Sequence, residues 1–171
     1  MRKQRQTWLL ILGLVCSFPN VYAQTELKAS DLASFLGTWN LDSTTSGTTG
    51  PERRVISTGT GWMRVEIHRS GDSHPPILIY NLDGSRRVNP FGPATATTQI
   101  RRDGDDIVTV TVVNIEDRPV TVEERLRLTS AGEMAVAILV RVEHGYEGVQ
   151  PAQEKHGPNV AEGSKLFQKV P

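Results

Sequence analysis

Alternation of apolar and polar side chains with a period of two constrains the fold of this chain more than any other feature. Met63, Val65 and Ile67 alternate with charged or imidazole side chains, and residues 119–129 and 133–143 repeat the pattern. Successive side chains of a strand point to opposite faces, so each of these segments has one apolar and one polar face. Such strands are typical of an antiparallel sheet that covers a single core.

Short segments rich in Gly and Asp separate the alternating stretches. Asp83-Gly84 and Asp103-Gly104-Asp105 are two examples, and both residue types suit tight reversals of the chain. With links this short, each strand pairs with its sequence neighbour, and a long meander curls until its edges meet. The predicted fold is therefore all-β, an up-and-down antiparallel meander closed into a barrel of about eight or nine strands. The strands are expected at residues 37–42, 53–58, 62–69, 77–82, 95–102, 106–115, 119–129, 133–143 and 165–170.

Three segments depart from the alternation. Ser30 is a capping residue, and Leu32, Phe35 and Leu36 follow it at helical spacing, which predicts one or two helical turns before the first strand. Residues 145–163 are rich in Gly and Pro and lack periodicity, which predicts a long loop. The polar stretch 44–50 predicts a shorter first loop.

The first residues have the pattern of a secretory signal. Basic residues at positions 2, 3 and 5 precede the apolar run 8–15, and small residues end at Ala23. The apolar run is shorter than the about 20 residues that cross a bilayer. We therefore expect residues 1–23 to be a signal peptide and residues 24–171 to form one exported domain, periplasmic or extracellular. Lipid attachment at Cys16 is disfavoured because Val15 stands where such sites have a small residue.

Charge and cysteine content limit the partners of the exported chain. The whole sequence has 19 basic and 19 acidic residues, and three of the basic ones lie in the signal segment. The remainder is mildly acidic, which argues against nucleic acid and against stable membrane association. Cys16 is the single cysteine, so the exported domain contains no disulfide and relies on its apolar core.

The segment Gly37-Thr38-Trp39, preceded by a short helix, resembles the motif that opens the lipocalin and calycin barrels. The chain is also similar to small exported bacterial lipocalin-like proteins, in the turn Tyr80-Asn81-Leu82-Asp83-Gly84 and in the last strand around Phe167. The resemblance implies that Trp39 plugs one barrel end, with a basic side chain from a late strand on its ring. Lys169, Lys165 and Arg141 are the candidates. Such a resemblance implies a fold more strongly than an activity.

Clusters of polar residues give no catalytic or metal-binding signature. The four histidines, His68, His74, His144 and His156, lack metal-ligand spacing. The acidic turn at residues 103–106 offers too few oxygens for calcium. The basic pairs 53–54, 86–87 and 101–102 would attract an anion only if they met at one rim. No cofactor is predicted.

The leading hypothesis is a barrel that binds a small hydrophobic or amphipathic molecule. Of the adjacent Glu123 and Glu124 only Glu124 could face inward, and inside an apolar barrel it would be protonated or paired. We expect either a partner such as a neighbouring arginine or a position near the rim. One alternative is an envelope interaction or inhibitor protein that acts through its loops. Another is a lipocalin-fold enzyme, for which Glu124 and Tyr80 are the only plausible polar groups. The predicted ligand-binding residues are Val65, Ile67, Tyr80, Val110, Val122, Glu124 and Ile138.

Overall fold

The structure is a computed structural model that describes residues 26–42, 50–115, 118–142 and 159–171. The predicted signal peptide and most of the predicted first loop lie outside these ranges, as do His144 and His156. No helix within the described ranges is long and apolar enough to cross a membrane. The elements are the 3₁₀ helix η1 (Ala29–Phe35) and the strands β1 (Gly37–Leu41), β2 (Glu52–Gly59), β3 (Trp62–Arg69), β4 (Ile77–Asn81), β5 (Arg87–Phe91), β6 (Ala94–Asp103), β7 (Asp106–Ile115), β8 (Arg118–Leu128), β9 (Met134–Val142) and β10 (Asn159–Lys169).

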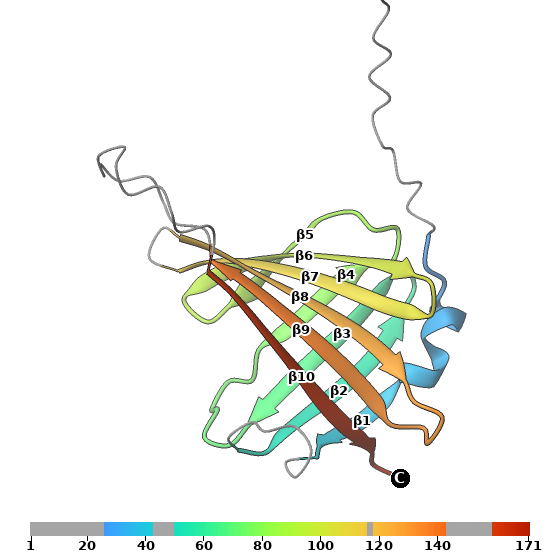
Figure 1. The fold of residues 1–171 in the computed structure, drawn as a ribbon. Coiled ribbons are helices and arrows are strands. Elements are labelled where there is room, and N and C mark those ends of the chain that lie inside the picture. The colour runs from blue at the N-terminus through green and yellow to red at the C-terminus, as the bar shows by residue number, and fades with distance from the viewer. Residues whose placement is uncertain (1–25, 43–49, 116–117, 143–158) are drawn as a thin grey trace, which may run out of the picture.

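The ten described strands form one antiparallel sheet in the order β4-β3-β2-β1-β10-β9-β8-β7-β6-β5. Nearly every strand pairs with its sequence neighbour, and the pairing of β1 with β10 joins the two halves of the meander (Figure 1). In that pairing Trp39 lies opposite Lys169 and Leu41 lies opposite Phe167. The prediction of an all-β up-and-down barrel with a short helix before its first strand is confirmed, with ten strands in place of nine.

Two differences from the predicted strands have local causes. The additional strand is β5, in which Arg87, Asn89 and Pro90 hide the apolar alternation. β10 begins at Asn159, so residues 159–163, which we expected to belong to a loop, pair with β9 instead. Gly163 and Ser164 supply no apolar side chain there, and the backbone ladder to β9 holds the strand. The rest of the expected loop, up to residue 158, lies outside the described residues.

Trp39 closes one end of the barrel. Its ring is fully buried, and its Nε1 donates a hydrogen bond of 2.8 Å to the carbonyl oxygen of Phe35 in η1. The Nζ atom of Lys169 lies 5.3 Å from the ring centroid, which is the cation–π contact that the resemblance implied. Gly37 has a φ of +122°, and a Cβ atom there would lie 3.2 Å from Cε of Lys169. Glycine therefore suits both the backbone conformation and the approach of the lysine.

Side chains, rather than a backbone ladder, connect β4 to β5, which stand at the two ends of the strand order. We call this junction the seam. The buried Asn89 side chain donates to the carbonyl oxygen of Ile79 and accepts from its amide, both at 3.0 Å. The Thr98 hydroxyl donates to the same carbonyl oxygen at 2.6 Å and accepts from Asn89 at 2.8 Å. The asparagine amide thus replaces the peptide group of a paired strand and satisfies the edge of β4.

Replacing Asn89 with leucine, which has a similar volume, should destabilise the barrel at the seam. Both backbone groups of Ile79 would lose a hydrogen bond to the asparagine, so we expect the free energy of unfolding to fall by about 2–4 kcal/mol. Chemical denaturation measures the loss, and hydrogen exchange should show faster exchange of the Ile79 amide. Asn40→Leu, at an exposed position of β1, is the control. Equal losses in the two variants would contradict this role for Asn89.

Candidate ligand-binding site

Burial of the inward-facing side chains changes along the barrel axis. In β8 the positions that share the face of Glu124 are Val120, Val122, Leu126 and Leu128. Leu126, toward the Trp39 end, is fully buried, whereas Val120 and Val122, toward the other end, are half-buried. β9 repeats the trend, because Met134 and Val136 are buried and the later inward positions of that strand are not. The barrel is therefore densely filled at the Trp39 end, and less so at the opposite end, which we call the open end.

Six of the seven predicted ligand-binding residues face the interior, but at different depths. Val65, Ile67 and Tyr80 are buried within the hydrophobic core. Ile138 packs against that core and is half-buried, as is Val122. Val65 and Ile67 therefore contribute to the filled core.

Val110, the seventh predicted residue, lies on the outer face of β7. Its register partners are Gln99 in β6 and Glu123 in β8, and Glu123 forms its ion pairs on the outer face, with Arg101 and Arg125. The neighbouring Thr109 and Thr111 occupy the inward positions instead. An apolar residue on each face of β7 made the two faces hard to distinguish in the sequence.

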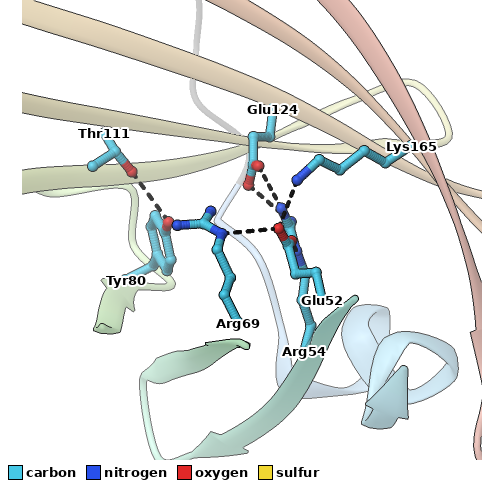
Figure 2. A network of polar contacts seen from close by, with 7 residues as sticks. All are labelled: Glu52, Arg54, Arg69, Tyr80, Thr111, Glu124 and Lys165. Atoms are coloured by element: carbon cyan, nitrogen blue, oxygen red, sulfur yellow. Dashed lines mark hydrogen bonds and ion pairs between the residues drawn. The ribbon is translucent and has the colours of Figure 1, made fainter. Parts of the chain in front are cut away.

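Arg54 lies at mid-depth and is only 2% exposed. Its Nη2 and Nη1 atoms donate to the two carboxylate oxygens of Glu124, at 2.8 and 3.1 Å. Its Nε donates to Glu52 at 2.8 Å, and its guanidinium carbon lies 4.9 Å from the ring centroid of Phe167. Arg54 thus connects β2 to β8 through Glu124 (Figure 2) and to β10 through Phe167. Glu124 therefore faces inward and pairs with an arginine, which is the first of the two expected alternatives.

Glu52 accepts hydrogen bonds from three cations. Besides Arg54, Lys165 of β10 donates to it at 2.6 Å and Arg69 of β3 at 3.2 Å. Burial raises the pKa of the Glu52 carboxyl, but Arg54 and Lys165 outweigh burial and lower that pKa to about 2. Glu52, Arg54, Glu124 and Lys165, which we call the polar layer, thus carry two negative and two positive formal charges.

Tyr80 extends the polar layer toward β7. Its hydroxyl lies 3.2 Å from the Thr111 hydroxyl, within hydrogen-bond distance. Burial and the nearby Glu124 carboxylate raise the pKa of Tyr80 to about 12, despite opposing contributions from Thr111, Thr109 and Arg54. Glu124 and Tyr80, the two polar groups considered for an enzyme, bond to different partners, Arg54 and Thr111.

A cavity of about 870 Å³ lies at the open end, beside the seam. The connection between β3 and β4, the β5–β6 hairpin and the end of β7 surround it. Arg69 belongs to its wall and also contacts Glu52, so the cavity borders the polar layer. The lining is mostly apolar and includes Pro75, Pro76, Ile77, Ile79, Pro90, Phe91, Pro93, Ala94, Val113 and Ile115; its polar members are Arg69, Asp72, His74, Asn89 and Asn114.

None of the seven predicted residues lines this cavity. The prediction followed strand alternation, whereas strand ends and turns form most of the cavity wall. The prolines at 75, 76 and 93 were the available signal, because they mark the β3–β4 connection and the β5–β6 hairpin. Pro90 lies in β5, at one end of the strand order, where proline is tolerated. Arg54 was also missed, although it shares the parity of the inward-facing Ile56.

The other charged clusters are structural in the part of the chain that the structure describes. Asp103 bonds Arg125 at 2.7 Å and Asp106 bonds Arg127, so the acidic turn is neutralised by arginines. The basic pairs do not share one rim, since Arg54 is internal and Arg101 pairs with Glu123 outside. No group of three potential metal-ligating side chains occurs among the described residues.

Solved structures with the same architecture include proteins from three animals. A secretary abundant heat soluble protein from Ramazzottius varieornatus matches with a TM-score of 0.54 and 8% identity, over 80% of this chain and 96% of that chain. Schistosoma mansoni fatty acid binding protein, solved in complex with arachidonic acid, matches with a TM-score of 0.52 and 9% identity, over 82% and 99%. The chain has a calycin-type fold.

Caenorhabditis elegans lipid binding protein 8 shares this calycin-type fold, with a TM-score of 0.52 and 8% identity over 85% of this chain and 100% of that chain. No model of a protein family matches the sequence, and no curated protein matches it. At such low identities, the likeness shows the fold alone.

Replacing Arg54 with methionine should strongly destabilise this calycin-type barrel. The change leaves Glu52 and Glu124 without their shared partner inside the barrel, and loss of one member of a buried ion pair costs about 3–5 kcal/mol. Denaturant unfolding at neutral pH measures the loss. Arg53→Met, at the adjacent exposed position, should change the free energy of unfolding by no more than about 0.5 kcal/mol. A comparably small loss at Arg54 would show that Glu52 and Glu124 do not depend on Arg54 for compensation of their charges.

The stability of the protein should depend on the ionisation of Glu52 in acid. Its pKa is about 2 in the folded chain and 4.5 ordinarily, so its contribution is present above pH 4.5 and is lost as the pH falls toward 2. In Glu52→Gln the free energy of unfolding should therefore fall less steeply across this range. Glu162→Gln, at an exposed position, should keep the wild-type slope. The role of Glu52 would be refuted by identical slopes in all three proteins.

Proposed function

We propose that the chain is an exported barrel that binds a small hydrophobic or amphipathic molecule in the cavity at its open end. The observation that carries the proposal is the cavity of about 870 Å³ with its mostly apolar lining. Pockets for small ligands commonly measure about 300–1,000 Å³ and combine apolar walls with a few polar groups. The filled core at the Trp39 end leaves binding to the open end.

Proteins of the same fold support this proposal by analogy. One neighbour was solved with arachidonic acid bound, and another is a lipid binding protein. Analogy of fold raises the expectation of an apolar ligand without identifying it.

Export is the second part of the proposal, and it is supported by the basic start, the apolar run 8–15 and the small-residue site at Ala23. Cleavage there would yield a chain beginning at Gln24, in the periplasm or outside the cell.

Native mass spectrometry of the protein, purified gently from an exported fraction, tests both parts. We expect the mass of residues 24–171 plus an additional mass that is lost on denaturation. A chain that keeps its first 23 residues would contradict export. A bare chain that gains no mass from lipid extracts would contradict ligand binding and would favour action through the surface loops.

Filling the cavity should weaken binding. Ala94 lines the cavity and faces inward in β6, so the larger side chain of Ala94→Phe occupies space that a ligand would fill. We expect the dissociation constant of Nile red, an uncharged apolar dye, to rise at least about tenfold. Fluorescence titration measures it. Ala137→Phe makes the same change at an exposed position of β9 and should bind as the wild type does. Unchanged binding by Ala94→Phe would place the ligand elsewhere.

A further inference from the structure

The basic groups at mid-depth of the barrel are already neutralised by carboxylates of the chain itself. Arg54 donates three N–H groups to Glu124 and Glu52. Lys165 donates to Glu52, and the side chains of Arg54 and Lys165 are only 2% and 14% exposed. The polar layer has no net formal charge, and no cation in it lacks a carboxylate partner.

The cavity wall is balanced in the same way. Its charged lining residues are Arg69 and Asp72, of opposite sign, and its imidazole, His74, is charged only when protonated. Arg69 also contacts Glu52 at 3.2 Å. Together with the polar layer, these side chains carry three positive and three negative formal charges.

The interior already disfavours an anion at one position close to the polar layer. Tyr80 would become an anion on losing its proton, and burial followed by the Glu124 carboxylate raises its pKa to about 12. A carboxylate that entered at this depth would meet the same two effects, loss of water and repulsion by Glu124.

We propose that the cavity selects uncharged apolar ligands, such as long-chain alcohols and esters, and discriminates against fatty acid carboxylates. The inference rests on the proposed function and defines its ligand class. An anionic head group would gain Arg54 or Lys165 only by displacing Glu124 or Glu52. Arg69, whose side chain is 53% exposed, already has the Glu52 carboxylate beside its Nε. An alcohol or ester head needs only hydrogen bonds, which the Asn114 amide and the His74 ring in the wall offer.

The direct test compares three ligands with the same chain length: dodecan-1-ol, methyl dodecanoate and dodecanoate. Each competes with Nile red for the wild-type protein at pH 8, below the concentration at which micelles form. We expect the dissociation constant of dodecanoate to be at least about tenfold higher than those of the alcohol and the ester.

Glu124→Gln tests the cause of this selectivity. The variant keeps an oxygen that can accept from Arg54 but removes one negative charge, so dodecanoate should bind about tenfold more tightly than it does to the wild type, with dodecan-1-ol unchanged. Glu123→Gln is the matched control, because Glu123 immediately precedes Glu124 and faces outward. Asp72→Asn, at an exposed position of the cavity wall, should shift selectivity in the same direction if Glu124→Gln does not fold.

The outcomes separate this inference from the proposed function. If dodecanoate binds the wild type as tightly as the alcohol and the ester do, or more tightly, the inference is overturned and ligand binding stands. If Glu124→Gln and Asp72→Asn both leave the ratio unchanged, charge balance is not its cause and the inference also fails. If none of the three ligands displaces Nile red, and Ala94→Phe has no effect on the dye, both proposals fail.

Discussion

The backbone N–H and C=O groups along a strand edge need hydrogen-bond partners, and the closure of this barrel depends on how that need is met. Among the strands that the structure describes, nine backbone ladders satisfy it between neighbours. At the seam a ladder gives way to the Asn89 side chain, which bonds both backbone groups of Ile79. Because the barrel closes there through side chains, β4 and β5 need not lie at ladder distance. The cavity adjoins this place, and Ile79 and Asn89 both contribute to its wall.

The polar layer divides the interior into two regions with different physical character. Toward Trp39, side chains such as Met63, Met134 and Phe167 are fully buried and fill the space. Toward the open end, the inward-facing Val120 and Val122 of β8 are half-buried and the cavity begins. A buried ion network of this kind contributes little net stability compared with an apolar core of the same volume. The proposed discrimination against carboxylates would give the network a chemical consequence that packing alone does not have.

Much of the fold could be predicted from sequence, because local patterns determine it. The alternation of Met63, Val65 and Ile67 identified β3, and the Gly37-Thr38-Trp39 motif located the closed end. β5 was not predicted, because its contacts at the seam come from Asn89 rather than from an apolar stripe. The position of the cavity was not predicted, because turns that are distant in the sequence form its wall. Glu124 was recognised as inward-facing, but its partner Arg54 lies 70 positions away, a distance that no local pattern spans.

The pairing of β1 with β10 has a consequence for how the chain acquires its shape. Trp39 lies opposite Lys169, so the contact that joins the two halves links residues 130 positions apart. Long-range pairings of this kind slow folding, because a large loop must close before they form. During synthesis the earlier strands emerge with β1 still lacking one of its two neighbours. The barrel is therefore completed only after β10 has left the ribosome, and until then β1 presents an unpaired edge that other chains could join.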